Sequence, residues 1–239
     1  MPADSAALPL PSRWILSKLA ECSAEVNAGL STFDAGRSTK ALYRWWYQDF
    51  CDTYLEWSKP GLWGQDMKSS AHAATLSVCV DGAARLLQPF MPFLAEEFYQ
   101  RLHYLGMAGV GPGDATAPPV SVGVAPFPLG PAEYSTEQSL LQEVSSIHGK
   151  AGDAARGFQV SLADYRDSKS EARFSALLLV VGVARSLSDT RSRILGANTG
   201  PAPSYARRIL LVAQSQNLSD LLEEHRHELE FLLRLRVDT

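Results

Sequence analysis

The sequence predicts a mainly α fold, in which an antiparallel helical bundle is followed by a small mixed α/β tail. Before residue 103, apolar residues recur at helical spacing in four segments that short breaks separate. Helices with one apolar face and short connections are typical of an antiparallel bundle. After residue 137, helical patterns flank one apolar run that suits a strand. We therefore predict a bundle over 1–105, a Gly- and Pro-rich connection over 106–136 and a helical or mixed subdomain over 137–239.

The first helix is expected to open at Pro11 or Ser12, since proline is tolerated in the first turn of a helix. A short turn over 31–34 then leads into the next helix. The apolar stripe of the first helix consists of Ile15, Leu19, Cys22, Val26 and Leu30.

The central helix is expected to run from an N-cap at Asp34 to a stop at Lys59-Pro60, because a proline disfavours helix at the residue before it. Its apolar arc is wide, which predicts a helix that is covered on more than one side. We expect its tryptophans in the core, with an exposed stacking platform as the alternative. It holds three of the five tryptophans, Trp45, Trp46 and Trp57. One apolar stripe consists of Leu42, Trp46, Phe50, Thr53 and Trp57, and a neighbouring stripe of Tyr43, Tyr47, Phe50 and Tyr54.

Two further helices complete the predicted bundle. Residues 61–66 have the composition of a turn. Pro89 and Pro92 separate the third helix from a short fourth one, because proline fits a helix best in its first turn. The third helix has Ala73, Leu76, Val80, Ala83 and Leu87 in phase, and the fourth has Leu94, Phe98 and Leu102.

The composition of the chain changes at residue 106. Residues 106–131 are rich in Gly, Pro and Ala and predict a loop, within which VSVGV at 120–124 suits a brief extended segment. The elements expected after it are a helix over 137–147, a polar insertion near 150–170, a helix from Phe174 to Ile194 and a strand in RRILLVAQ at 207–214. A final helix carries Leu218, Leu221, Leu222, His225, Leu229 and Leu232, with Asn217 or Ser219 as its N-cap.

Composition and charge narrow the class of protein. The formal net charge is −4 and 46% of the residues are hydrophobic, which is ordinary for a globular protein. No apolar run approaches the ~20 residues of a membrane span, and the N-terminus lacks the pattern of a secretory signal. A cytoplasmic protein without membrane contact is predicted, and a mitochondrial location stays open for a longer parent chain. The cysteines form no CxxC pair, which predicts buried thiols at Cys22, Cys51 and Cys79.

No arrangement of residues in the sequence suits catalysis or a metal ion. The five histidines do not pair as metal ligands, and His225 and His227 fall on different faces of a helix. We expect the histidines to be exposed or half-buried and to have structural roles. Glu96 and Glu97 are adjacent, so they do not face each other as an acid–base pair. They are expected to be solvent-facing or capping charges.

Four stretches of the chain carry a family resemblance. They are SRWILSKL at 12–19, FCDTYLEWSKPGL at 50–62, LLQPFMPFLAEEFYQRL at 86–102 and VAPFP at 124–128. These stretches resemble the valyl-tRNA synthetases, a branch of the class I aminoacyl-tRNA synthetases. The resemblance is close from about Pro11 to Leu102, thinner to Pro128 and weak after that. The resemblance implies that this chain corresponds to the helical anticodon-binding domain, which lies in the C-terminal part of these enzymes.

The resemblance implies a domain that binds the anticodon stem and loop of a tRNA, in first place tRNA-Val, within a parent that joins valine to tRNA with ATP. The family's His-Ile-Gly-His and Lys-Met-Ser-Lys-Ser signatures do not occur, so we expect this chain alone to be inactive and to need no cofactor. Family members also carry a helix ahead of SRWILSKL, and without it we expect a less complete RNA site. The alternatives are a non-enzymatic module that binds a protein partner and a helical enzyme with an unrecognised site.

Lysine and arginine side chains are the candidates for contacting tRNA phosphates. Arg37, Lys40 and Arg44 recur at i, i+3 and i+7, so they share one face of the central helix. By the topology of the family, the two candidates on the first helix lie nearby, and the three after residue 180 form a second basic cluster. An ordinary solvated charge is the competing interpretation for each residue. The candidates are Arg13, Lys18, Arg37, Lys40, Arg44, Arg185, Arg191 and Arg193.

Overall fold

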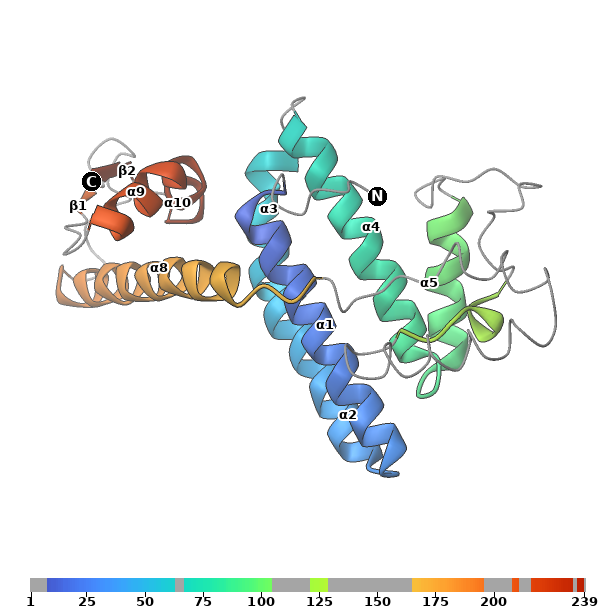
Figure 1. Cartoon of the computed structure of the whole chain (residues 1–239). Helices are drawn as coiled ribbons and strands as arrows, with labels where there is room; N and C mark the ends of the chain where they lie inside the picture. Colours follow the sequence, from blue (N-terminus) through green and yellow to red (C-terminus); the bar gives the residue numbers. More distant parts are fainter. Residues whose placement is uncertain are drawn as a thin grey trace.

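The computed structural model of the chain is mainly helical, as the sequence predicts (Figure 1). It describes residues 8–62, 67–104, 121–128, 165–195, 208–210, 216–233 and 236–238. The described elements are α1 (Leu10–Ser31), α2 (Ala35–Tyr43), the π-helix η2 (Arg44–Tyr54), α3 (Leu55–Leu62), α4 (Met67–Leu87), α5 (Pro92–Tyr104), the 3-10 helix η3 (Val122–Val124), α8 (Ser168–Leu195), β1 (Arg208–Leu210), α9 (Gln216–Glu224), α10 (Arg226–Leu233) and β2 (Arg236–Asp238).

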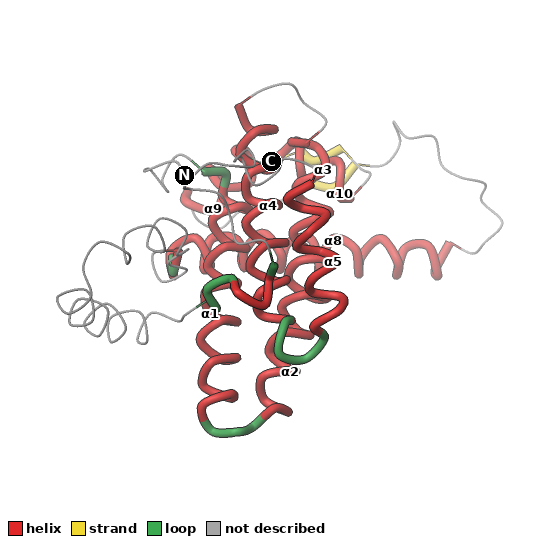
Figure 2. The backbone as a smooth tube through the Cα atoms, turned by 90° about the vertical axis from the view of Figure 1, so that its right-hand side faces the viewer, coloured by secondary structure: helices red, strands yellow, loops and turns green. Residues whose placement is uncertain are grey.

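Helices α1 and α2 form an antiparallel hairpin (Figure 2). Helix α1 begins one residue before the predicted start and has proline in its first turn. Asp34 caps α2 as predicted, because its carboxylate accepts a hydrogen bond from the N–H of Arg37 at 2.9 Å. The two helices approach closely at Gly29, where a β-carbon would overlap Ser38 Oγ. The hairpin therefore requires a residue without a side chain at this position.

The central helix differs from the prediction in its winding and in its end. The chain is helical from α2 through α3, but its middle part, η2, is a π-helix with the wider i→i+5 hydrogen-bonding pattern. The hydroxyl of Thr53 donates to the carbonyl of Gln48, five residues back, at 2.8 Å. The predicted stop at Lys59-Pro60 is wrong, because Pro60 lies inside α3. A proline in the last turn removes a single backbone donor, so the helix continues past it.

The wider turn of η2 changes which aromatic side chains face the core. The buried residues of η2 are Trp45, Phe50 and Tyr54, which are five and four positions apart. The prediction that Tyr43 and Tyr47 belong to a buried stripe is wrong, because their side chains are 61% and 50% exposed. A stripe drawn at the 3.6-residue spacing of an α-helix does not follow a π-helical turn.

An aromatic core joins the central helix to α1 and α8. Trp45 and Trp57 are buried, as predicted, whereas Trp46 is half-buried. The ring of Phe174 in α8 lies between two tryptophans, with centroids 4.9 Å from Trp57 and 4.6 Å from Trp14 of α1. Each buried aromatic side chain removes roughly 150–250 Å² from water. Helix α8 is therefore part of the same core as the bundle.

Helix α4 turns a different face to the core than predicted. The predicted stripe begins with Ala73 and Leu76, but Ala73 is exposed and Leu76 is half-buried. Small residues on the buried face let α4 approach α1, and a β-carbon at Gly82 would lie 3.0 Å from Leu19 Cδ2. Four of the five predicted positions are displaced by one residue, and only Ala83 is buried as predicted. The close packing of α4 on α1 selects a small residue at Gly82. The buried residues of α4 are His72, Thr75, Cys79, Gly82, Ala83, Ala84, Arg85 and Leu86.

The burial of His72 and His225 contradicts the expectation that the histidines are exposed or half-buried. His72 Nδ1 lies 3.2 Å from Ser12 Oγ and 3.3 Å from Tyr54 Oη. Hydrogen bonds of this kind offset the cost of burying a polar side chain. This cluster joins α1, η2 and α4 inside the bundle. His227 is exposed, so it and His225 face different ways, as predicted.

Helix α5 packs on α4 through residues next to the predicted ones. Leu102 is buried as predicted, but Leu94 is exposed and Phe98 is half-buried. Ala95 and Tyr99 fill the buried face instead. Two of the three predicted positions are therefore displaced by one residue toward the C-terminus, whereas the displacement in α4 is toward the N-terminus.

Residues 122–124 form the 3-10 helix η3, so the predicted extended segment is wrong at this point. The Ser121 hydroxyl accepts a hydrogen bond from the N–H of Gly123 at 3.2 Å, which tightens the turn. Glu96 of α5 accepts hydrogen bonds from the Ser121 hydroxyl at 2.8 Å and from the N–H of Val122 at 3.0 Å. Glu96 thus caps this turn, as predicted for a structural carboxylate. Glu97 pairs with Arg101 on the solvent side of α5.

Helix α8 confirms the predicted helix from Phe174 to Ile194 and begins earlier, at Ser168. In Figure 1 it extends away from the side of the bundle. The predicted loop residues 106–120 and 129–136 lie outside the described residues. The predicted helix over 137–147 and the insertion up to residue 164 do so as well. The domain boundaries drawn from the sequence stay predictions.

The terminal unit contains two short helices and two strands of three residues each. Strands β1 and β2 pair in parallel, with Arg208 opposite Arg236. The predicted single final helix is wrong, because it divides at His225 into α9 and α10. Asn217 and Ser219 lie inside α9 and are not its caps. With strands this short the molecule is mainly α, and the mixed α/β tail stays a prediction.

Candidate nucleic-acid interface

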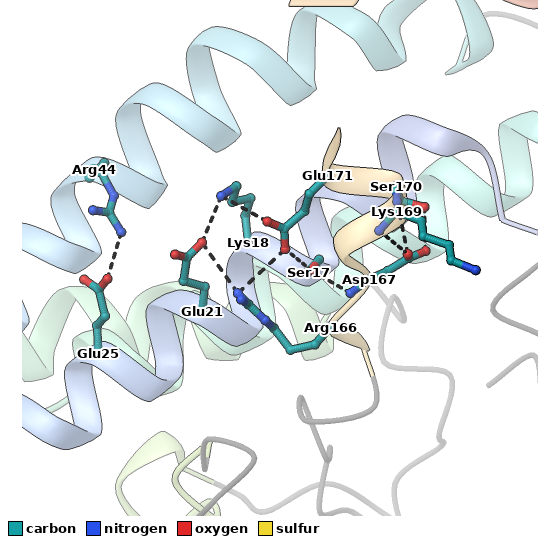
Figure 3. A network of polar contacts seen from close by, with 10 residues as sticks. All are labelled: Ser17, Lys18, Glu21, Glu25, Arg44, Arg166, Asp167, Lys169, Ser170 and Glu171. Carbon is teal, nitrogen blue, oxygen red and sulfur yellow. Dashed lines mark hydrogen bonds and ion pairs between the residues drawn. The ribbon is translucent and has the colours of Figure 1, made fainter. Parts of the chain in front are cut away.

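The three basic residues at the start of the central helix lie on its solvent side, in keeping with their spacing. Arg37 and Lys40 belong to α2 and Arg44 begins η2, and all three residues are exposed. Arg44 Nη2 lies 3.3 Å from Glu25 Oε1 of α1 (Figure 3). Arg37 and Lys40 form no ion pair with any residue that the structure describes. Their charges face solvent without a described acidic partner.

Arg13 and Lys18 lie on the side of α1 that faces the start of α8, and both are ion-paired there. Lys18 Nζ is 2.9 Å from Glu21 Oε2 and 3.5 Å from Glu171 Oε2. Arg13 Nη1 is 3.7 Å from Asp167 Oδ2. Burial opposes the charge of Lys18, but the hydrogen bond and the charges of its acidic neighbours outweigh this effect and raise the pKa of Lys18. Both cations are thus partly neutralised within the chain.

Ser17 lies at the centre of this contact between α1 and α8 (Figure 3). Its hydroxyl donates to the carboxylate of Glu171 and accepts a hydrogen bond from the N–H of Asp167 at 2.9 Å. The Asp167 carboxylate in turn accepts a hydrogen bond from the N–H of Ser170 at 3.0 Å, in the first turn of α8. The polar residues of α1 therefore hold the start of α8 in place.

Carboxylates lie among the basic side chains from Arg44 of η2 to the start of α8 (Figure 3). Glu25 and Glu21 lie between Arg44 and Lys18. Mixed charges of this kind favour contact between parts of one chain over attraction of a polyanion. The successive ion pairs are Arg44 with Glu25, Lys18 with Glu21 and Glu171, and Arg166 with Glu21 and Glu171.

The second basic cluster lies on α8. Arg185 is exposed on this helix. Arg191 and Arg193 belong to the same helix, but their side chains lie outside what the structure describes. A role for this cluster in binding RNA stays a prediction.

Two exposed tyrosines beside the basic residues of α2 are missing from the sequence-based candidates. The ring centroids of Tyr43 and Tyr47 lie 4.5 Å apart, with an interplanar angle of 36°. Lys40, Tyr43 and Arg44 follow the α-helical spacing i, i+3, i+4 at the end of α2, which places them on one helix face, and the contact between the two rings puts Tyr47 beside Tyr43. The sequence contains this signal, but the wide apolar arc of the central helix assigns the tyrosines to the core.

The described residues contain few groups suited to covalent or metal chemistry. No group of three or more His, Cys, Asp and Glu side chains among them could hold a metal ion. Cys22 and Cys79 are buried as predicted, whereas Cys51 is half-buried. Burial raises the pKa of Cys22 to about 12, which makes its thiol a poor nucleophile. Across the same residues, no helix combines the length and the apolar character that a bilayer crossing needs.

Comparison with known proteins bears out the family resemblance. Residues 12–173 match the family described as "Anticodon-binding domain of tRNA ligase". The chain is 35% identical over 146 residues to a valine–tRNA ligase of Gloeobacter violaceus, an alignment that covers 59% of this chain and 15% of that protein. It is 35% identical over 160 residues to the mitochondrial valine–tRNA ligase of Sus scrofa, covering 67% and 14% of the two chains.

A valine–tRNA ligase of Rattus norvegicus is 41% identical over 127 residues, which cover 53% of this chain and 9% of that protein. The chain thus spans only 9–15% of the length of these three relatives. The family match contains the helical bundle except the first two residues of α1, and it extends into the start of α8. With more than half of its residues matched, this chain belongs to the family of anticodon-binding domains of tRNA ligases.

Proposed function

We propose that this chain binds tRNA through its helical bundle, with tRNA-Val as the preferred partner. The observation that carries the proposal is the family match over residues 12–173. The similarity to proteins named valine–tRNA ligase supports tRNA-Val over other tRNAs. In a longer parent, the bundle holds the anticodon stem and loop while a separate catalytic domain joins valine to tRNA with ATP.

The exposed basic face of α2 supports this proposal. Arg37 and Lys40 are the candidate cations of the bundle without a described acidic partner, and Arg44 follows one turn later. Lysine and arginine side chains that contact phosphates release counterions from the nucleic acid, which gives affinity that falls steeply with salt. Arg13 and Lys18 are secondary candidates, because a phosphate has to compete there with the carboxylates of the α1–α8 contact.

The chain by itself is proposed to be catalytically inactive and to need no cofactor, and its place of action is proposed to be the cytoplasm. The nucleotide-binding signatures of class I synthetases are absent from the sequence, which supports this view. An assay of valine-dependent exchange of pyrophosphate into ATP tests whether the chain is inactive. Exchange above a buffer control, with contaminating synthetase excluded, would show that the chain by itself is catalytically active and would contradict the proposal.

A salt-dependent binding titration tests the proposed function. The chain is titrated with a tRNA-Val transcript and with a non-cognate tRNA transcript at several salt concentrations. We expect binding to both at low salt, tighter binding of tRNA-Val, and a linear fall of log K with log salt. Absence of binding to either RNA at low salt would refute the proposal.

A protein-interaction module is the second candidate, and two exposed apolar features favour it. Met91 and Phe93 are exposed at the junction of α4 and α5. Leu179, Val183 and Leu187 are exposed along α8, and their spacing of four residues places them on one stripe. Exposed apolar patches often mark contacts with other proteins. If the titration finds no RNA binding, this function becomes the leading one.

A further inference from the structure

The tyrosine pair on the central helix is unusual for its exposure. Tyr43 at the end of α2 and Tyr47 in η2 lie with ring centroids 4.5 Å apart, and both residues are exposed. Every other aromatic residue of the central helix is buried or half-buried. Removing a large aromatic side chain from water lowers the free energy of the system. Two neighbouring exposed rings are therefore typical of a surface that a partner covers.

The charges around the pair indicate what that partner is. Lys40 and Arg44 lie beside the two rings, and Arg37 lies one turn before Lys40. Lys40 has no described acidic partner, whereas Arg44 is 3.3 Å from Glu25, so a phosphate has to compete with that carboxylate for Arg44. A groove or track of cations with aromatic rings between them holds single-stranded nucleic acid, because the cations take the phosphates and the rings take the bases. The exposed face of α2 and η2 therefore combines both halves of such a site.

We propose that Tyr43 and Tyr47 form a stacking surface for an unpaired base of the bound tRNA, while Lys40 and Arg44 hold the phosphates beside that base. This inference rests on the proposed tRNA binding and assigns it a contact point. The rings lie one helical turn apart, so a base that stacks on one ring has its flanking phosphates within reach of the cations on either side. Bases in loops are free to stack in this way, whereas paired bases are not.

Another exposed aromatic side chain shows why the surrounding charges matter. Phe93 of α5 is 91% exposed, but Glu96 and Glu97 follow it at i+3 and i+4. Carboxylates at these positions repel phosphates, so a nucleic acid is a poor partner for that ring. Phe93 therefore serves as a control residue, whose ring is more exposed than those of the two tyrosines and has carboxylates, one of them paired with Arg101, in place of the neighbouring cations.

The test compares four proteins: the wild type, a Tyr43→Ala/Tyr47→Ala variant, a Tyr43→Phe/Tyr47→Phe variant and a Phe93→Ala variant. Each is titrated at low salt with a tRNA-Val transcript and with a blunt RNA duplex of similar length. We expect the double alanine variant to bind the tRNA at least about fivefold more weakly, since stacking contributes about 1–3 kcal/mol per base. The phenylalanine variant and Phe93→Ala should stay within about twofold of the wild type, because stacking needs the ring and not the hydroxyl.

Two further readouts separate stacking from charge and from unfolding. The slope of log K against log salt should be the same for the wild type and the double alanine variant, because no cation is removed. The affinity for the duplex should also be unchanged, since it offers no unpaired base. Thermal melting by circular dichroism verifies that the variant is folded, as expected for exposed positions.

The outcomes distinguish this inference from the proposed function. If the wild type binds tRNA and the folded double alanine variant binds equally well, the stacking surface is wrong while tRNA binding stands, and the pair becomes a contact for a protein. If the alanine variant loses affinity for the duplex as much as for tRNA, the rings do not act by stacking. If the wild type binds no tRNA, both proposals fail.

Discussion

Trp45 is the largest fully buried side chain among the residues that the structure describes, and its ring packs on Phe50 with centroids 5.5 Å apart. Replacing Trp45 by alanine removes this packing and leaves a cavity, so we expect the free energy of unfolding to fall by about 3–5 kcal/mol. Denaturant unfolding followed by circular dichroism measures the loss. Tyr43→Ala, two positions earlier and exposed, is the matched control and should change stability by less than ~0.5 kcal/mol. A loss below about 1 kcal/mol for Trp45→Ala would show that the ring is not in the core.

Asp49 of η2 gives the protein a distinctive pH dependence. Burial raises the pKa of Asp49 to about 6, and the charges of Lys18 and Arg44 offset only part of this effect. In the unfolded chain the same carboxyl has a pKa of about 3.9, so the folded state binds the proton more tightly. Protonation of Asp49 therefore stabilises the folded state at about pH 4, and this stabilisation is lost as the pH rises through 6.

Asp49→Asn removes the titrating group and tests the argument. The difference in unfolding free energy between the wild type and the variant should change by on the order of 1 kcal/mol from pH 4 to pH 7, once solvent screening is allowed for. Glu21, whose pKa is lowered, affects both proteins alike and acts only at lower pH, so it cancels in the difference. A difference that is independent of pH would mean that Asp49 is ionised as readily in the folded state as in the unfolded one.

At the scale of the helices, two glycines offer a matched pair of tests. A β-carbon at Gly29 would overlap Ser38 Oγ and lie 2.9 Å from the carbonyl oxygen of Asp34, so Gly29→Ala has to push α1 and α2 apart. We expect it to cost about 1–3 kcal/mol of stability. At Gly182 in α8, by contrast, a β-carbon would have no neighbouring atom of the described residues within 4 Å.

Gly182→Ala should therefore stabilise the protein by about 0.5–1 kcal/mol, because alanine is the better helix former and meets no described neighbour. Thermal or denaturant unfolding of the two variants measures both effects. The opposite signs are the expected result, since both glycines lie in helices and only one lies at a close approach. Equal effects at the two sites would contradict the close contact between α1 and α2.

Apolar periodicity predicts the helices of the bundle well but not their winding or phase. The predicted helices correspond to α1, the α2–α3 run, α4, α5 and α8, because each buries one face over several turns. The π-helical turn of η2 is invisible to a pattern that assumes 3.6 residues per turn. The face of α4 is shifted because its close approach to α1 selects a small residue at Gly82, which carries little weight in an apolar pattern. The buried face of α5 is also shifted, but it holds the large ring of Tyr99.

At the scale of the whole molecule, the sequence identifies the basic residues but not their partners. Ser17 and Glu171 are hydrogen-bonded although 154 positions separate them. No local pattern reveals that the same carboxylate also lies 3.5 Å from Lys18. The sequence therefore cannot separate Arg37 and Lys40, which lack a described acidic partner, from the cations that α8 neutralises. Only the fold divides the candidate residues in this way.

The basic face of α2 leads to a prediction about how the whole chain binds RNA. A triple variant with Arg37→Gln, Lys40→Gln and Arg44→Gln should bind tRNA more weakly. Each lost phosphate contact should also reduce the slope of log K against log salt by about 0.7–0.9. Discrimination between tRNA-Val and a non-cognate tRNA should change little, because phosphate contacts position the RNA and base contacts specify it. Binding titrations over a range of salt concentrations measure affinity, slope and discrimination together.

A second triple variant separates the local effect from the change in net charge. Its substitutions replace three arginines on other helices that are already paired with glutamates. Both triple variants change the formal net charge from −4 by three units, so long-range repulsion of tRNA is the same in each. If the two variants lose equal affinity, net charge explains the effect and α2 is not a binding face. If the first variant is folded and keeps the wild-type affinity and slope, the phosphates are held elsewhere, and the cluster around Arg185 is the next to be tested. The control substitutions are Arg101→Gln, Arg173→Gln and Arg226→Gln.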